Sequence, residues 1–418
     1  MKLFYFILIL FLGKASAFMK KVCGIVAEYN PFHNGHRYHI EQTRALLGED
    51  TAIVCVMSGN FVQRGEPAVF LKHARAEAAL RCGADLVLEL PLPWAMATAE
   101  AFARGAVALL AASGVVTHLG FGSESGDLAA LDRIAELLLR PEMDPLIRDS
   151  LAVGLPYAAA RQRAAETLAG EPLEPFCAPN NILGIEYLKA LRASNLPMTP
   201  VTVLRRGAGH DESGTRGEYP SAAFLRQRLT NDRGLAGQMP DDAYNVFARE
   251  TEQGRGPVLP AALETALLSR LRMLPLSAFA ALPDAGEGLE NRLYRAAREE
   301  ATADAVLAAA VSKRYTRSRL RRMLWAAALG LRGEDAEGAP PYLRVLAANA
   351  WGRELLARMR KTASLPVITK PVAVRALDAR AQRVFGLEAD AADLYALAFS
   401  AKEARRGGQE WRRGPIML

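Results

Sequence analysis

The feature that most restricts the fold of this 418-residue chain is a junction near its amino terminus between an apolar segment and a helical pattern. Residues 22–27 (VCGIVA) are apolar, Pro31 marks a turn, and His33-Asn-Gly35-His36 opens a helical pattern that runs to about residue 47. A strand that leads through a short turn into a helix is the opening of a βαβ unit. The junction therefore predicts an α/β domain that begins at about residue 20.

The same junction carries groups that suit nucleotide phosphates. A helix N-terminus offers free N–H groups and the positive end of its dipole, and Gly35 allows a phosphate close to the backbone. His33 and His36 can donate hydrogen bonds to phosphoryl oxygens as charge builds up in a transition state. The alternative is a surface histidine and a capping histidine in an ordinary turn, because short motifs also occur by chance. Open α/β folds bind ligands after their first strand, which favours a nucleotide site.

Short apolar segments alternate with helical patterns over the first two hundred residues. Further strands are expected at residues 52–57, 85–90, 115–121 and 198–204, and helices at residues 72–82, 94–113, 128–139, 145–168 and 182–194. Short apolar strands separated by helices indicate a parallel sheet that is covered on both faces. We expect a Rossmann-like, doubly wound parallel sheet.

Beyond about residue 245 the strand patterns stop. Helices are expected at residues 259–276, 289–313, 318–331, 342–361 and 389–404. These patterns predict an α/β domain with the candidate nucleotide site at 19–240, an all-helical C-terminal domain at 241–404, and a basic, mobile tail at 405–418.

Residues 1–18 have the form of a secretory signal peptide, because an apolar run precedes an Ala15-Ser-Ala17 site. The run is too short for a comfortable membrane span. Met19 stands directly before the first strand, and a phosphate site of this type needs a cytosolic nucleotide. We therefore expect residues 1–18 to be a mispredicted start of a cytoplasmic protein, with an exported or membrane-tethered protein as the alternative.

Composition adds weaker constraints. Half of the residues are hydrophobic, which is normal for a folded core, and the formal net charge of +7 is compatible with RNA binding. The four cysteines are scattered, without zinc-ligand spacing or a disulfide framework, and they suit a reducing compartment. No motif predicts a metal site.

The segment at 58–67, after the second expected strand, is polar and contains glycine. Ser58, Asn60 and Gln63 can orient a small polar substrate, and Arg64 can pair with a carboxylate or a phosphate. The alternative is a long surface loop. Next along the chain, Lys72 and Arg75 point either to phosphate or to water.

Three further groups follow strands at the same predicted edge of the sheet. Gly122 would let an adenine or a ribose lie against the backbone. Asn180 or Asn181 would hydrogen-bond the adenine, or both are plain helix caps. Arg205 and Arg206 suit a triphosphate.

The densest basic run lies at 312–322. Its cationic side chains are Lys313, Arg314, Arg317, Arg319, Arg321 and Arg322. Charge runs usually form solvated helix faces, but six basic residues without an acid also suit an RNA backbone. We expect these side chains to contact RNA.

Five segments together resemble one bacterial family. They are GIVAEYNPFHNGHRYH (24–39), MSGNFVQRGEPA (57–68), GADLVLELP (83–91), FGSE (121–124) and PNNILGIEYL (179–188). In this order they resemble the tRNA(Met) cytidine acetate ligase family, within the HIGH-type nucleotidyltransferase superfamily. The resemblance extends from about residue 20 to about residue 370.

The resemblance implies that ATP activates acetate to acetyl-adenylate, and that the acetyl group passes to N4 of the wobble cytidine of elongator tRNA(Met). His33 and His36 would stabilise the α-phosphate, with Ser58, Asn60 and Arg64 completing the catalytic set. Mg²⁺ would neutralise the phosphates, with ligands that no motif identifies. The implied ATP-binding residues are Val26, Ala27, Glu28, Tyr29, Asn30, Pro31, Phe32, His33, Asn34, Gly35, His36, Arg37, Tyr38, His39, Gly122, Asn180, Asn181, Arg205 and Arg206.

The implied partners are tRNA and acetate, without DNA or stable membrane association, and the helical domain would hold the tRNA. The sequence also departs from the family. Alanines replace two hydroxyl positions in the helix start Ser221-Ala-Ala-Phe-Leu-Arg226, and Gly209-His210 stands where the family tends to have Tyr-His. Two alternatives therefore stay open: a nucleotidyltransferase for a small molecule, and an RNA-binding protein with a vestigial nucleotide site.

Overall fold

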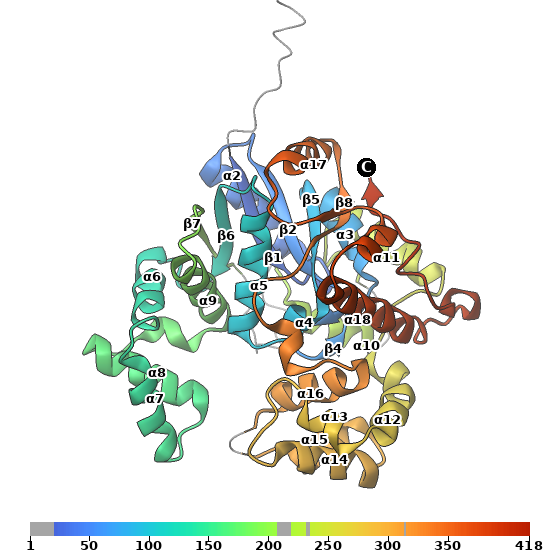
Figure 1. Cartoon of the computed structure of the whole chain (residues 1–418). Helices are drawn as coiled ribbons and strands as arrows, with labels where there is room; N and C mark the ends of the chain where they lie inside the picture. The colour runs from blue at the N-terminus through green and yellow to red at the C-terminus, as the bar shows by residue number, and fades with distance from the viewer. Residues whose placement is uncertain (1–20, 207–218, 231–234, 313–314) are drawn as a thin grey trace, which may run out of the picture.

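The computed structural model describes residues 21–206, 219–230, 235–312 and 315–418. Its centre is a sheet (Figure 1) with the strand order β10-β8-β5-β2-β1-β6-β7, and β9 pairs with β8. The strands are β1 (Val22–Ala27), β2 (Ala52–Ser58), β5 (Leu86–Leu90), β6 (His118–Ser123), β7 (Thr199–Leu204), β8 (Leu343–Ala348), β9 (Val367–Ile368) and β10 (Ile416–Met417). A separate hairpin joins β3 (Phe61–Val62) to β4 (Glu66–Pro67). All pairs in the large sheet are parallel except β5 with β8.

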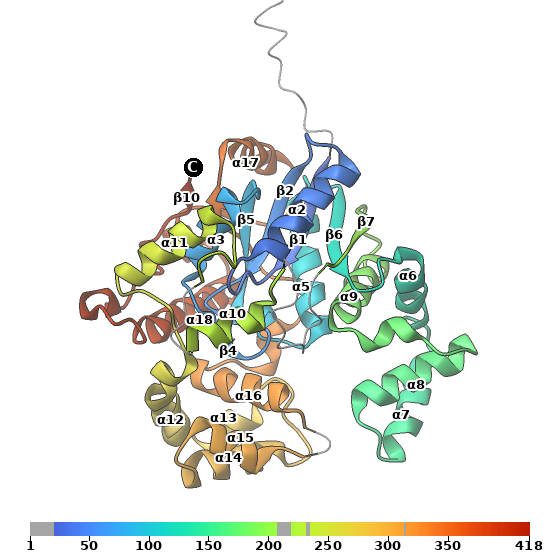
Figure 2. The same ribbon diagram turned by 180° about the vertical axis from the view of Figure 1, so that it is seen from behind.

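Helices cover both faces of the sheet (Figures 1 and 2). One face packs against α2 (Asn34–Leu47), α3 (Lys72–Arg81) and α11 (Asp241–Glu252), and the other against α5 (Ala99–Ala112), α9 (Pro179–Ala193) and α17 (Ala350–Thr362). Successive residues of β2 explain why both faces must be covered, because Ile53 and Cys55 enter one core while Val54 and Val56 enter the other.

In the part of the chain that the structure describes, six further α-helices lie outside the separate helical region below the sheet. They are α4 (Leu92–Ala95), α6 (Leu128–Leu137), α7 (Met143–Ala152), α8 (Tyr157–Ala169), α10 (Ala222–Thr230) and α18 (Ala379–Ala396). The α7–α8 pair projects from the body of the molecule at the lower left of Figure 1.

A helical region below the sheet has a core of its own. It consists of α12 (Glu264–Met273), α13 (Leu276–Ala280), α14 (Leu289–Glu299), α15 (Ala303–Ala310) and α16 (Arg317–Leu329). Leu271, Leu293 and Leu320 are fully buried in this core. Helix α18 belongs to both cores, since Val384 packs with the sheet and Tyr395 packs with the helical region.

The predicted fold class is confirmed as a mostly parallel, doubly wound sheet with a helical C-terminal region, although the chain returns to the sheet after α16 and adds β8, β9 and β10. The five expected strands are present as β1, β2, β5, β6 and β7. The single helix expected at 342–361 is wrong, because Leu343–Ala348 forms β8 and a helix begins only at Ala350. A short, mostly apolar run does not distinguish a buried strand from a buried helix by periodicity, and here β8 extends the sheet beside β5.

The mobile tail expected at 405–418 is also wrong. Ile416 and Met417 pair with β8 as the edge strand β10. The Trp411 ring lies 4.6 Å from the ring of Phe385, and the side chain of Glu410 is only 3% exposed. Apolar and charged partners within the fold hold the tail in place. Among the residues that the structure describes, no helix is long and apolar enough to cross a membrane, while the leader 1–18 lies outside them.

Candidate active site

The candidate site lies where the strand order of the sheet reverses. From β1 the chain builds outward to β2 and β5 on one side, and later to β6 and β7 on the other. Open α/β sheets bind ligands at the carboxyl ends of the strands that flank such a switch point. The residues 33–36 follow β1, and Gly122 and Ser123 end β6. The fold therefore brings the first motif and the FGSE segment to the same edge.

The turn between β1 and α2 is fixed by buried side chains. Tyr29 adopts a positive φ of 48°, and its ring lies 4.8 Å from the Phe32 ring and 4.9 Å from the His36 ring. Asn30 is buried, and its Oδ1 accepts a 2.8 Å hydrogen bond from the Val69 backbone N–H. Tyr29, Asn30 and Phe32 therefore shape the turn that presents the imidazoles.

His33 and His36 cap helix α2 together. His33 Nδ1 accepts from the Gly35 backbone N–H at 3.0 Å, and His36 Nδ1 accepts from the His33 backbone N–H at 3.2 Å. The two rings stack at 3.7 Å with an interplanar angle of 27°. Because Nδ1 accepts in both rings, the neutral tautomer carries its proton on Nε2. Each imidazole thus keeps one Nε2–H donor for a ligand.

Both imidazoles are neutral in the free protein. Burial, followed by the positive charges of Arg205 and Arg226, lowers the pKa of His33 to about 3. Burial, His33 and Arg205 hold the pKa of His36 well below its usual value. Burial and Arg205 likewise lower the pKa of His39 to about 4. Two arginines that repel protons from these rings would attract an anion to the same place.

Arg205 and Arg226 therefore flank the histidine pair. Arg205 follows β7, and its backbone N–H donates to the Ser123 carbonyl at 2.9 Å. A Cβ atom on Gly122 would lie 3.2 Å from Arg205 Cγ, so a larger residue at this position would crowd Arg205. Arg226, on α10, donates from Nη1 to the Asn30 carbonyl at 3.0 Å. The sequence named Arg205, whereas Arg226 was doubtful because the preceding hydroxyls are missing.

The asparagine pair is engaged by a carboxylate that the sequence did not single out. Glu124, just after β6, accepts hydrogen bonds from the Asn180 side chain at 2.6 Å and from the Asn181 backbone N–H at 2.8 Å. Asn181 Oδ1 accepts in return from the Glu124 backbone N–H at 2.9 Å. Glu124 thereby caps α9, whose own N-cap residue provides no side-chain bond. The pair lies at the expected edge, and its contact with adenine stays a prediction.

A buried arginine anchors the loops after β1 and β2. The Arg75 guanidinium, 0% exposed, donates to the backbone carbonyls of Glu28, Ser58, Gly59 and Phe70. Burial lowers the pKa of Arg75 to about 10. Arg75 therefore binds neither phosphate nor water, and instead fixes the backbone of the candidate site. Its acceptors are distant in sequence, so no local pattern could have indicated this role.

The other residues expected in the loop at 58–67 serve different purposes. Ser58 is fully buried, and its Oγ has no hydrogen-bond partner in the described part of the chain. Asn60 Oδ1 accepts from the Lys72 backbone N–H at 3.0 Å at the start of α3. Burial and the charge of Arg226 lower the pKa of Arg64, which places Arg64 near the arginine of α10. In the same loop, Glu66 Oε1 lies 3.4 Å from Arg226 Nε.

Other expected ATP contacts lie in β1, in α2 and just after β7. Arg37 pairs with Glu41 at 2.7 Å on the exposed side of α2. The Arg206 guanidinium lies 5.4 Å from the centre of the Tyr38 ring. Val26 and Ala27 lie inside β1, and Asn34 begins α2. Among the described residues, no group of three or more histidine, cysteine, aspartate or glutamate side chains could hold a metal ion.

The described arginines of the basic run at 312–322 contact carboxylates and a backbone carbonyl of the protein itself. Lys313 and Arg314 lie outside the described residues. Arg317 pairs with Asp304 at 2.6 Å, Arg319 donates to the Asp284 carbonyl at 2.8 Å, Arg321 pairs with Glu66 at 2.8 Å, and Arg322 lies 3.9 Å from Asp284. RNA contact by these arginines stays a prediction. Arg321 instead links α16 to the loop at 58–67.

A second buried charge cluster adjoins this loop. Lys72 Nζ lies 2.6, 2.9 and 3.6 Å from the carboxylates of Glu89, Glu410 and Glu388. A Cβ atom on Gly59 would lie 2.6 Å from Glu89 Oε1. Lys72 therefore points neither to phosphate nor to water, and it ties the sheet edge to the C-terminal segment.

Comparisons with known proteins agree with this geometry. The family described as HIGH Nucleotidyl Transferase matches residues 19–410. The tRNA(Met) cytidine acetate ligase of Acetivibrio thermocellus is 37% identical over 415 residues, which cover 95% of this chain and 100% of that protein. The tRNA(Met) cytidine acetate ligase of Caldanaerobacter subterraneus is 39% identical over 386 residues, covering 90% and 95%.

Solved structures give the same assignment. The crystal structure of apo Thermotoga maritima TmcAL (form I) superposes with a TM-score of 0.91 at 36% identity, covering 95% of this chain and 99% of that chain. T. maritima TmcAL bound with alpha-thio ATP superposes with a TM-score of 0.89 at 35% identity, with the same coverage. Since sequence and fold both agree over nearly the whole length, the chain belongs to the HIGH nucleotidyl transferase family and, within it, to the tRNA(Met) cytidine acetate ligases.

Proposed function

We propose that this chain is an ATP-dependent ligase that acetylates a cytidine of tRNA(Met). In the first step an acetate oxygen bonds to the α-phosphorus of ATP while the bond to the leaving oxygen of pyrophosphate breaks. In the second step N4 of the wobble cytidine of elongator tRNA(Met) attacks the acetyl carbonyl, AMP leaves, and N4 gives up one proton. The mixed anhydride formed in the first step supplies the driving force for acylation of this weakly nucleophilic amine.

The observation that carries the proposal is the stacked pair His33 and His36 at the switch point, between Arg205 and Arg226. Two neutral imidazoles with Nε2–H donors, at the N-terminus of α2, would stabilise negative charge on the α-phosphate as the pentavalent arrangement forms. The two arginines suit the β- and γ-phosphates because a guanidinium binds phosphate oxygens in pairs. The structure of T. maritima TmcAL bound with alpha-thio ATP supports nucleotide binding by this chain.

A magnesium ion would reach this site with the nucleotide. The described residues provide no cluster of three oxygen or nitrogen ligands. Mg²⁺ commonly keeps water and substrate phosphates as most of its ligands, so the residues present are compatible with a metal carried by the triphosphate. When bound, it would neutralise phosphate charge. ATP and tRNA are cytoplasmic substrates, and we place the protein in that compartment.

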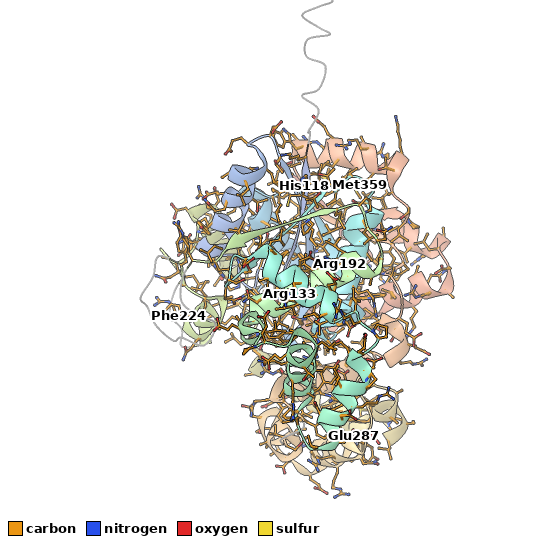
Figure 3. The ribbon with its side chains drawn as sticks, turned by 90° about the vertical axis from the view of Figure 1, so that its left-hand side faces the viewer. His118, Arg133, Arg192, Phe224, Glu287 and Met359 are labelled. Carbon is orange, nitrogen blue, oxygen red and sulfur yellow. The ribbon has the colours of Figure 1, made fainter. Side chains whose placement is uncertain are left out.

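The first test is isotope exchange between ATP and pyrophosphate. We expect exchange by the protein that starts at Met19, stimulated by acetate, and a loss of about a hundredfold or more in His36→Ala because one donor to the developing charge is gone. His118→Ala is the matched control. His118 lies at the amino end of β6 (Figure 3), where its Nδ1 contacts the Thr117 hydroxyl at 2.8 Å, and its replacement should leave exchange unchanged.

The second test is mass analysis of the wobble cytidine after incubation with ATP, acetate and elongator tRNA(Met). An acetyl mass gain on this base, together with acetate-dependent exchange, would establish the ligase. Exchange without the gain would indicate another acceptor or a small-molecule nucleotidyltransferase. tRNA binding without any exchange would indicate an RNA-binding protein with a vestigial nucleotide site.

A further inference from the structure

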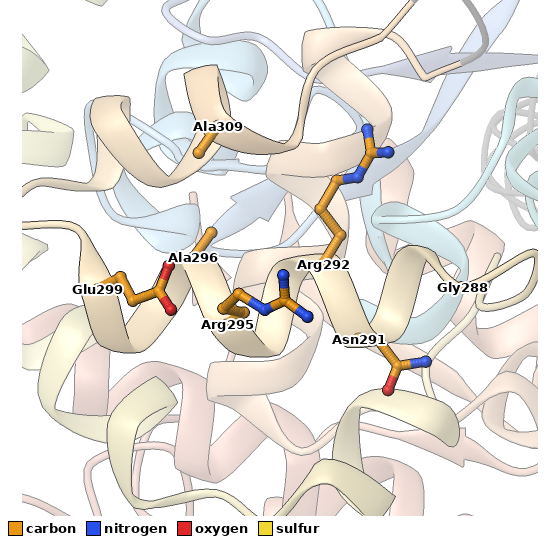
Figure 4. A pocket seen from close by; sticks show the side chains of 7 residues that line it. All are labelled: Gly288, Asn291, Arg292, Arg295, Ala296, Glu299 and Ala309. Carbon is orange, nitrogen blue, oxygen red and sulfur yellow. The ribbon is translucent and has the colours of Figure 1, made fainter.

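The outer face of α14 lines a surface cavity of about 390 Å³ (Figure 4). The helix buries Leu289, Leu293 and Ala297 in the core of the helical region. The adjoining face of the helix lines the cavity, together with Ala309 of α15; the lining side chains of α14 are Asn291, Arg292, Arg295, Glu299 and Ala296, of which Ala296 also belongs to that core. Small-molecule pockets are mainly apolar, whereas guanidinium, amide and carboxylate groups dominate here. The cavity therefore suits a polar, charged ligand.

The arginines of this cavity have unused donors. Arg295 forms no hydrogen bond or ion pair with any residue that the structure describes. Arg292 reaches only the Ala310 carbonyl, at 3.5 Å, which is beyond the usual range for an N–H donor. Arg295 and Glu299 have the i, i+4 spacing that often forms an ion pair on a helix, yet no such pair forms within 4.0 Å. Figure 4 shows the two guanidinium groups on neighbouring turns of α14.

This contrasts with α16, which carries the densest basic run of the sequence. All four described arginines of that run engage protein acceptors, and Arg321 and Glu66 link the helix to the loop after β2. A polyanion at α16 would have to compete with these partners, whereas the donors on α14 are available. We propose that Arg292 and Arg295 bind the phosphodiester backbone of the tRNA on which the proposed acyl transfer acts.

The chemistry of the groove fits this ligand. The planar guanidinium offers paired N–H donors that match two phosphate oxygens, and Asn291 adds a neutral amide for a phosphate or a ribose hydroxyl. Glu299 repels phosphate from the far end of α14, so the backbone would lie at the end that carries Asn291, Arg292 and Arg295. Contacts of this kind position an RNA without reading its sequence.

The groove belongs to a helical region that packs against the loop after β2. The helical region lies on the side of the sheet toward which β1 and β2 run (Figures 1 and 2). At their contact, a Cβ atom on Gly65 would overlap the backbone of Arg322, so α16 packs directly on the loop after β2. In Figure 3, Glu287, just before α14, is visible on the side of the molecule that carries α7 and α8. A tRNA held by α14 would thus be attached to the same body as the histidine pair.

The test compares two double variants that each remove two positive charges. Arg292→Gln/Arg295→Gln alters the groove, and Arg358→Gln/Arg360→Gln alters α17 at the opposite end of the molecule (Figure 1). Binding of elongator tRNA(Met) is measured by fluorescence anisotropy at several salt concentrations. We expect the groove variant to lose affinity by about tenfold or more at low salt, and its log–log salt slope to fall by about 1.4 to 1.8.

Activity separates this proposal from the proposed function. The groove variant should keep the acetate-dependent ATP–pyrophosphate exchange of the unaltered protein, and should raise KM for tRNA with little change in kcat. Equal losses of tRNA affinity in both double variants, or unchanged affinity and salt slope in the groove variant, would overturn the tRNA groove while leaving the ligase proposal intact. A failure of the unaltered protein to acetylate tRNA would instead refute the ligase, and the binding titration would still decide whether the groove holds RNA.

Discussion

Replacement of Lys72 by methionine tests whether the buried charge cluster around this lysine stabilises the folded protein beside the candidate active site. The Lys72 side chain is 1% exposed, and its Nζ contacts the carboxylates of Glu89, Glu410 and Glu388. Burial opposes its charge, but these three carboxylates raise the pKa of Lys72 above its usual value. Methionine has a similar shape and removes only the charge and the donors. We expect a protein that folds but is markedly less stable.

The contacts set the size of the effect. Removing one partner of a buried ion pair costs about 3–5 kcal/mol, because the other charge is left buried without compensation. Glu410 would keep Arg344, 3.1 Å away, whereas Glu89 and Glu388 have no other ion-pair partner among the described residues. Burial and the neighbouring Glu89 already raise the pKa of Glu388, so a proton on Glu388 would relieve part of the loss. We therefore expect about 3 kcal/mol at neutral pH.

The pH dependence of the stability loss in Lys72→Met tests this reasoning more specifically than its size does. A carboxyl group whose pKa is raised in the folded state adds stability below its unfolded pKa and loses it as the pH rises through the folded value. The deficit of Lys72→Met in urea denaturation should thus be larger at about pH 8 than at about pH 5.5, and Glu388→Gln should reduce it. Lys361→Met, at the exposed end of α17, is the control. A deficit below about 1 kcal/mol, or one that is independent of pH, would refute the reasoning.

Three further outcomes follow from other contacts. Burial holds the pKa of His33 at about 3 and that of His36 well below its usual value. The pH profile of kcat/KM for ATP in the exchange reaction should therefore show no histidine inflection between about pH 5.5 and 8. An inflection near about pH 6.5 that His36→Ala removes would contradict this prediction. Gly65→Ala should lower the stability of the protein in urea more than Gly237→Ala does. Both glycines have φ near +70°, but only Gly65 packs against α16. Equal losses of stability in the two variants would disprove the contact. Arg226→Gln should reduce exchange about a hundredfold in kcat/KM with an unchanged melting temperature, and a wild-type rate would remove Arg226 from the phosphate site.

Local patterns predicted the elements that local chemistry determines. The apolar run of β1, the turn and the capping histidines are contiguous, so the sequence alone located the α/β junction and the histidine pair that we propose to bind phosphate. Strand β8 was missed because its partner, β5, lies more than two hundred residues earlier, and a mostly apolar six-residue segment is too short to show a clear helical or strand period.

Side-chain roles that depend on distant partners were not predictable in the same way. The carbonyls that bind Arg75 and the helix end that Glu124 caps become neighbours only after the sheet has formed. The basic run illustrates the opposite error, because a high local density of arginine indicates an RNA surface only when no carboxylate or carbonyl approaches it. In the folded chain Glu66 and Asp284 approach α16, while on α14 Arg295 has no acceptor among the described residues and Arg292 reaches only the Ala310 carbonyl, at 3.5 Å.

A final prediction concerns the contribution of the C-terminal segment to the stability of the folded protein. Removal of residues 409–418 deletes the strand β10, the Trp411 ring on Phe385, and the Glu410 carboxylate that both Lys72 and Arg344 contact. Two buried cations would then share the carboxylates of Glu89 and Glu388, and the Ala347–Ala348 end of β8 would lose its partner strand β10. We expect the melting temperature to fall by more than about 4 °C, with the single variant Glu410→Gln accounting for a large part of the loss. If the shortened chain had the same melting temperature as the full-length protein, residues 409–418 would not contribute to stability. The charge cluster around Lys72 then could not be what holds this segment to the sheet.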